Sequence, residues 1–123
     1  MQWKLSDDRP IYVQLMETIT AAIASGTLAA GSRLPSVREM AAQAGVNPNT
    51  MQRALSELER DGLLYSQRTA GRFVTDQSDR ITQKRKELAM QQIRIFLSSM
   101  KEMGYTSEQT LTLIQQAVKE EHL

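Results

Sequence analysis

Polar side chains suited to contacting DNA bases lie within residues 45–62, GVNPNTMQRALSELERDG. An arginine can pair bidentately with guanine in the major groove, and an asparagine or a glutamine can pair with adenine. Every surface helix has a side that faces water, so such side chains by themselves are equally consistent with a solvent-exposed surface and with DNA contact. Four of them share one face of a predicted helix and have no obvious partner within it: Asn49, Gln52, Arg53 and Ser56.

The helix that carries this polar face has a well-specified start. Asn47 suits the N-cap, and Pro48 then takes the first helical position, where its missing N–H costs nothing. Apolar residues follow at the spacing i, i+3, i+4 and i+7, which predicts one buried stripe. They are Met51, Ala54, Leu55 and Leu58.

A shorter helix is predicted just before this one. Ser36 and Glu39 fit a capping box, in which a hydroxyl and a carboxylate each accept a bond from the other residue's backbone N–H. Ala41 allows two helices to cross closely, and Gly45 allows the left-handed turn between them, as a helix-turn-helix requires. Arg38, in the first turn, would reach the groove edge or a phosphate, although an ordinary solvent-exposed arginine is the plainer alternative.

Another helix is predicted upstream, from Pro10 to about Gly26. A connector, residues 27–36 (TLAAGSRLPS), links it to the helix-turn-helix, and Leu28 and Leu34 are its expected anchors in the core. The apolar face of the upstream helix is formed by Ile11, Leu15, Ile19 and Ile23.

The hydrophobic period changes after the third helix to that of strands. Residues 63–65 and 72–74 predict two strands, and residues 67–71 predict a short polar turn between them. Arg68 near the tip would meet a phosphate or the minor groove, although hairpin tips are polar in any case. Three helices and a hairpin together predict a winged helix-turn-helix over residues 1–75.

Residues 76–123 predict a two-helix tail. A long apolar stripe runs to Gly104, and Thr106 to Gln109 suit the start of the last helix. The last helix can cover only part of this stripe. Because soluble monomers rarely expose large apolar patches, a second copy of the tail is expected to cover the rest about a two-fold axis. The expected dimerisation residues are Leu88, Ile93, Phe96, Leu97, Met100, Met103, Leu111, Ile114 and Val118.

Composition sets further limits. Of the 123 residues, 41% are hydrophobic and 24% are charged, as in a globular protein. The lack of cysteine excludes disulfides and thiolate chemistry, and the lack of a secretory signal or a long apolar run argues for a cytoplasmic protein without a membrane partner. The net charge is only +1, so any DNA-binding surface depends on local grouping. Six of the eight basic residues in positions 1–75 do lie between Arg33 and Arg72.

Enzymatic chemistry finds little support in these residues. His122 is the one histidine and lies next to the last residue, where it is a poor general base or metal ligand. The sequence has no nucleophile–base pair, no phosphate-cradling glycine loop and no metal-ligand spacing. We therefore expect no catalytic site, no metal and no cofactor.

Residues 34–64, LPSVREMAAQAGVNPNTMQRALSELERDGLL, closely resemble the DNA-binding domain of the GntR family of bacterial transcription regulators. The resemblance extends over roughly residues 5–75. It implies DNA contacts from the Leu-Pro-Ser segment, from the start of the recognition helix and from the wing. Thr69 departs from the glycine common in the wing, and Pro48 stands where some members place a base-reading side chain. By position the contacts fall on Ser36, Arg38, Asn47, Asn49, Thr50, Gln52, Arg53, Arg68, Thr69 and Gly71.

The short tail resembles that of the YtrA-like subfamily, whose members often regulate genes for ABC transporters. The expected fold is mainly α with a small β-hairpin wing, a winged helix-turn-helix followed by a two-helix dimerisation tail. The resemblance implies a homodimeric regulator, most simply a repressor, whose recognition helices enter the two halves of an inverted-repeat operator.

Two alternatives stay open at this level. A winged helix can dock on a protein and bind no DNA, because fold alone does not decide function. The tail can also enclose a small-molecule effector whose identity the sequence does not reveal, and this alternative is compatible with DNA binding.

Overall fold

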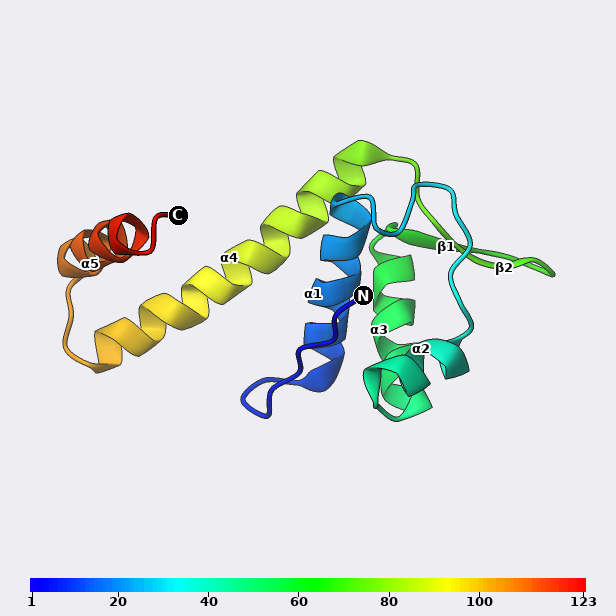
Figure 1. The fold of residues 1–123 in the computed structure, drawn as a ribbon, viewed down its shortest axis with the longest axis horizontal. Helices are drawn as coiled ribbons and strands as arrows, with labels where there is room; N and C mark the ends of the chain where they lie inside the picture. The colour runs from blue at the N-terminus through cyan, green and yellow to red at the C-terminus, as the bar shows by residue number, and fades with distance from the viewer. The chain divides into compact units, whose positions relative to one another are not determined.

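The computed structural model describes all residues 1–123 and divides into two compact units, Met1–Lys86 and Glu87–Leu123, which are described separately. The mainly α fold with one antiparallel hairpin confirms the expected fold class (Figure 1). None of the five helices combines the length and apolar character needed to cross a membrane. In chain order the elements are α1 (Ile11–Ala24), α2 (Val37–Ala44), α3 (Pro48–Arg60), β1 (Leu64–Gln67), β2 (Gly71–Val74), α4 (Ser78–Glu102) and α5 (Ser107–Glu120).

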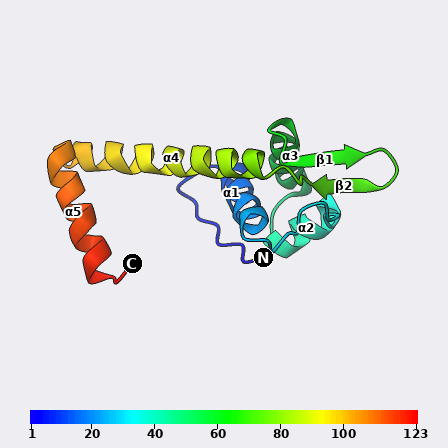
Figure 2. The ribbon, with the colours of Figure 1, turned by 90° about the horizontal axis from the view of Figure 1, so that it is seen from above.

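The core of the first unit lies where α1 and α2 pack on α3. The apolar stripes predicted for α1 and α3 are buried there except for the half-buried Ile11, and the inner face of the hairpin adds to them. Figure 2 shows the hairpin projecting beyond α2 and α3, so its tip is free of the core. The largest fully buried side chains include Leu15, Ile19, Met40, Met51, Leu55, Leu58, Leu63, Leu64 and Val74.

The starts of α2 and α3 follow from their capping residues. The Asn49 backbone N–H donates to Asn47 Oδ1 at 2.7 Å, and Pro48 is the first residue of α3, as predicted. The Glu39 backbone N–H donates to Ser36 Oγ at 3.1 Å, but the Glu39 carboxylate does not accept a bond from Ser36 in return. The full capping box expected at α2 is therefore wrong, because the exposed Glu39 side chain lies in water.

The hairpin is anchored along its outer edge by the connector. β1 pairs with β2 from Leu64↔Val74 to Gln67↔Gly71, so each strand extends further toward the turn than predicted. The Leu34 backbone N–H donates to the Arg72 carbonyl at 2.8 Å, and the Val74 N–H donates to the Ser32 carbonyl at 2.9 Å. No local pattern predicted this third line of pairing, which leaves β2 without an open edge there.

The first turns of α4 belong to the first unit. Ile81 packs against its core, and Lys84 Nζ lies 2.7 Å from the Asp61 carboxylate at the end of α3. The division between units therefore falls inside α4, after Lys86, whereas the sequence suggested a boundary at residues 75 and 76.

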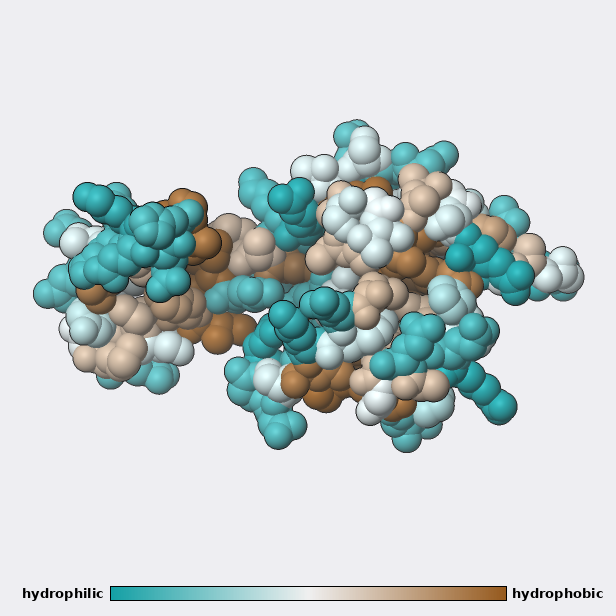
Figure 3. Space-filling view, viewed as in Figure 1, coloured by the Kyte–Doolittle hydropathy of each residue, from teal (hydrophilic) through white to brown (hydrophobic).

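In the second unit, α5 begins as predicted. The Gln109 backbone N–H donates to Thr106 Oγ1 at 3.1 Å, and the Thr106 N–H donates to Gln109 Oε1 at 3.0 Å. Of the residues expected to form the dimerisation surface, Leu88 and Met100 are buried and Ile114 is half-buried. Figure 3 shows hydrophobic side chains open to the surface of this unit. The exposed ones are Ile93, Phe96, Leu97, Met103, Leu111 and Val118.

Candidate nucleic-acid interface

A groove of about 490 Å³ lies between the hairpin and the start of α2. It brings together the connector, one residue of α3 and the hairpin turn. Three arginines line it, Arg33, Arg68 and Arg72, and no carboxylate does. Positive charge gathered in a hollow whose lining holds no carboxylate favours a polyanion such as the DNA backbone.

The groove contains half of the residues that the family resemblance assigned to DNA. Ser36, Gln52, Arg68, Thr69 and Gly71 line it. The others lie outside its lining, on α2 and along the start of α3. Of these, Thr50 is half-buried, and the exposed ones are Arg38, Asn47, Asn49 and Arg53.

Gln52 is the residue that connects α3 to the groove. Its Nε2 donates to Ser56 Oγ at 2.9 Å, one turn later on the same helix. The expectation that these two side chains have no partner within the helix was therefore wrong, since residues four apart share a helix face. A bidentate contact with adenine uses only one of the two amide hydrogens of Gln52, so the other can keep its bond to Ser56.

Arg53 has a partner as well, but on a different helix. Its guanidinium carbon lies 3.7 Å from the centroid of the Tyr12 ring on α1, a cation–π contact. Gln52 thus faces the hairpin side of α3 and Arg53 faces the α1 side. The polar face of α3 therefore extends from the hairpin side of the helix to the α1 side.

Two of the expected contact residues also cap helices. Ser36 Oγ and Asn47 Oδ1 accept the cap bonds of α2 and α3, so each oxygen already has one hydrogen bond. The Asn47 amide N–H₂ makes no hydrogen bond within the protein and is a free donor at the start of the recognition helix.

The structure explains why residue 71 is a glycine. Its φ is +109°, and a Cβ at this position would lie 2.9 Å from Arg33 Nε. The glycine therefore lets the Arg33 side chain lie against the hairpin. Beside it, Arg72 Nε donates to the Glu59 carboxylate at 3.3 Å and fixes the base of the hairpin to α3.

Sequence reasoning missed Arg33 and Arg72 as groove residues. Both were counted among the clustered arginines, but their spacing along the chain shows no shared face. The pairing of the connector with β2, including the bridge between Arg33 and Phe73, is what places them together.

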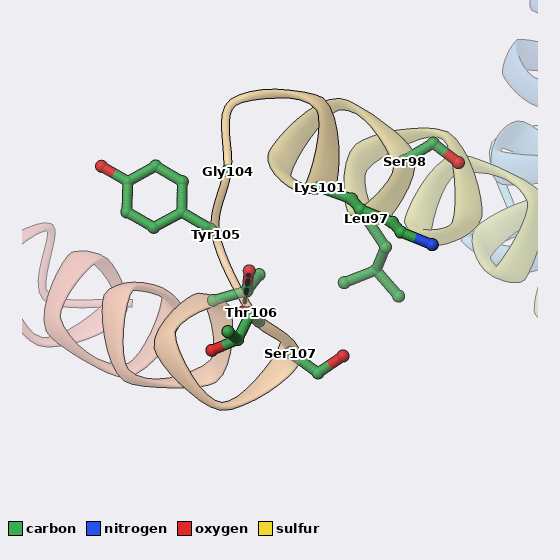
Figure 4. A pocket seen from close by; sticks show the side chains of 8 residues that line it. Leu97, Ser98, Lys101, Gly104, Tyr105, Thr106 and Ser107 are labelled. Atoms are coloured by element: carbon green, nitrogen blue, oxygen red, sulfur yellow. Dashed lines mark hydrogen bonds between the residues drawn. The ribbon is translucent and has the colours of Figure 1, made fainter.

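The second unit contains a separate pocket of about 540 Å³, between the end of α4 and the start of α5. Figure 4 shows the Tyr105 ring pointing away from Leu97 and Lys101. Lys101 is the one charged residue in the lining. The buried Thr110 hydroxyl donates to the Thr106 carbonyl at 2.9 Å, so it is already satisfied.

Residues 11–74 match the family model described as bacterial regulatory proteins, gntR family. The chain is 37% identical over 111 residues to YhcF of Bacillus subtilis, an uncharacterized HTH-type transcriptional regulator, and the match covers 90% of this chain and 92% of YhcF. It is also 37% identical over 67 residues to the HTH-type transcriptional repressor YtrA of the same organism, a match covering 54% of this chain and 52% of YtrA.

Two solved structures are similar to this one. A GntR family transcriptional regulator from Listeria monocytogenes has a TM-score of 0.73 and 37% identity, over 91% of this chain and 98% of the other. AraR(DBD), solved in complex with operator ORX1, has a TM-score of 0.53 and 34% identity, over 61% of this chain and 92% of the other.

Proposed function

Because this chain belongs to the GntR family of bacterial transcription regulators and is a DNA-binding regulator rather than an enzyme, we propose that it represses transcription as a homodimer on an inverted-repeat operator. The observation that carries the proposal is the arginine-lined groove beside the polar start of α3. The similarity to AraR(DBD), which was solved on operator DNA, supports the same use of this face.

In this proposal the start of α3 enters the major groove. Asn49 and Gln52 meet base edges there and supply specificity. Arg68 and Arg33 meet phosphates beside the wing, and Arg38 meets one beside α2. Such phosphate contacts set the register without reading sequence.

The exposed apolar side chains of the tail support the homodimer. Ile93, Phe96 and Leu97 on α4 are each more than two-fifths exposed, and Leu111 on α5 is 60% exposed. A second copy of the tail would bury them, and a two-fold pair of recognition helices matches the symmetry of an inverted repeat.

We infer repression and the kind of target gene from the likeness to relatives. YtrA of Bacillus subtilis is named a repressor, and a protein bound across a promoter blocks access to it. The likeness to YtrA-like regulators points to a transporter operon as the target, and the action lies in the cytoplasm, where bacterial DNA is found.

The decisive experiment is a footprint on the DNA upstream of the protein's own gene, combined with gel shifts at increasing salt. We expect protection of two half-sites related by a two-fold axis and binding that weakens as salt increases. Protection of a single site would contradict binding as a homodimer. No binding to any DNA would favour the alternative, a winged helix that docks on protein.

A response to a small molecule is the second candidate function, and the pocket beside Lys101 favours it. Organic anions that bind this pocket should raise the melting temperature, because a ligand selective for the native state stabilises it. The Lys101→Ala variant should lose the shift. A panel of carboxylates and sugar phosphates that leaves both proteins unchanged would contradict anion sensing.

A further inference from the structure

The contact between Arg53 and Tyr12 holds a positive charge that has no acidic partner. The guanidinium carbon is 3.7 Å from the ring centroid, yet no carboxylate pairs with it. Glu57, one turn later on α3, is instead 3.5 Å from Arg60. Arg53 is therefore held in place without being neutralised.

A guanidinium stacked on a ring contacts the ring through its flat face, and its edge stays available for hydrogen bonds. Its N–H donors lie in the plane of the group, where they can meet two oxygens of a phosphate at once. No hydrogen bond within the protein engages these donors in Arg53. Because the ring already restricts a long side chain, less conformational entropy is lost when an anion binds.

The position of Arg53 separates it from the residues suited to base readout. Gln52 turns toward the hairpin, whereas Arg53 turns toward the start of α1. A helix lying in the major groove presents its central face to base edges and its flanks to the two phosphate backbones. Arg53 is on the flank that lies opposite the wing.

We propose that Arg53 is a phosphate clamp and that Tyr12 is its positioning residue, so that α1 contributes to DNA binding through a side chain of α3. The inference rests on the proposed DNA-binding function. It replaces the base-reading role that the sequence suggested for Arg53. The wing and the Tyr12–Arg53 pair then hold the DNA backbone on both sides of the recognition helix.

The test measures affinity for operator and for random DNA across a salt series in the full chain. Arg53→Gln should weaken both affinities by the same factor, on the order of ten-fold, and lower the salt slope by about one. Tyr12→Leu should weaken both by roughly three-fold, and Tyr12→Phe, which keeps the ring, should match the parent. With Arg53→Gln already present, Tyr12→Leu should cause no further loss.

The spectroscopic control is the Nε–H resonance of Arg53 without DNA. Ring shielding should displace it in the parent and in Tyr12→Phe, and the displacement should vanish in Tyr12→Leu. Melting temperatures show whether each variant is folded. If Arg53→Gln weakens binding to operator DNA alone, Arg53 is a base reader and the proposal is overturned. The proposal is also overturned if Tyr12→Leu weakens binding equally in the parent and in Arg53→Gln. A parent protein that binds no DNA would instead overturn the proposed function.

Discussion

At the scale of single residues, three of the expected DNA-contacting side chains are held in place before any DNA arrives. Asn47 caps α3, Gln52 bonds to Ser56, and Arg53 stacks on Tyr12. Each restraint reduces the freedom that binding would otherwise remove. Gln52 keeps a second amide hydrogen for a base while the first bonds to Ser56.

Gln52→Ala is expected to reduce discrimination between operator and random DNA by about 1–3 kcal/mol and to leave the fold intact, because the side chain is exposed. Competition gel shifts measure the ratio of the two affinities. Gln116→Ala on α5 makes the same change in the other unit and should leave the ratio unchanged. An unaltered ratio in Gln52→Ala would exclude Gln52 from base readout.

Arg68→Ala is expected to weaken binding to all sequences alike and to lower the salt slope by about one, since its place in the hairpin turn suits a phosphate contact. Arg60→Ala is the matched control, because Arg60 is a highly exposed arginine in the last turn of α3 and does not line the groove. If Arg68→Ala instead changes the preference at particular A·T pairs, Arg68 reads the minor groove.

At the scale of elements, the hairpin is oriented by its neighbours rather than by its own turn. The connector pairs with β2 on one side, and the Arg72–Glu59 ion pair ties it to α3 on the other. The close approach of Arg33 to Gly71 adds a third restraint near the tip. A short isolated hairpin would be marginal in water, so these contacts determine where the wing points.

Gly71→Ala tests this arrangement. A Cβ there would lie 2.9 Å from Arg33 Nε, and the flexible Arg33 side chain would have to leave its place in the groove. We expect a loss of about 1–3 kcal/mol in unfolding free energy from the positive φ, together with weaker DNA binding. Chemical denaturation and gel shifts measure the two effects.

Gly31→Ala serves as the control for this prediction. Gly31 also has a positive φ, +75°, but no heavy atom lies within 4 Å of its added Cβ. It should lose about 1–2 kcal/mol of stability and keep its DNA affinity. Equal DNA affinities for the two folded variants would show that the Arg33 contact does not matter for binding.

At the scale of the whole molecule, the two units carry different tasks in the proposed function. The first has a closed core and presents the groove and the polar face of α3. The second leaves most of its large apolar side chains exposed. An exposed apolar face of this kind is normally covered by a partner, and a second copy of the chain satisfies the symmetry of an inverted repeat.

Phe96→Glu is expected to convert a dimer into a monomer, because a charge would have to be buried in the interface. Sedimentation at micromolar concentration measures the mass. Arg94→Glu, on the same helix outside the apolar stripe, should remain dimeric. The monomer should bind a full operator much more weakly, since the second half-site contact is no longer intramolecular. A dimeric Phe96→Glu or a monomeric parent would move the dimerisation role away from this face.

Local sequence signals were sufficient to place the helices and to identify their inner faces. Asn47 and Pro48 specify the start of α3, Thr106 and Gln109 specify the start of α5, and the apolar stripes of α1 and α3 identify the core. These signals are local, acting over three to seven residues, so they can be recognised without knowing the fold. The motif from Leu34 to Leu64 was specific enough to indicate the family, and with it a DNA-binding role.

The assembly of the candidate site depends on long-range packing. Arg33 enters the groove because the connector pairs with β2, and Arg53 turns to Tyr12 because α1 packs beside α3. Each of these contacts joins residues some forty positions apart in the chain. No periodicity or capping rule reaches over such a separation. The partners of a long, flexible arginine depend on which helices and strands surround it, and that is known only once the core has packed.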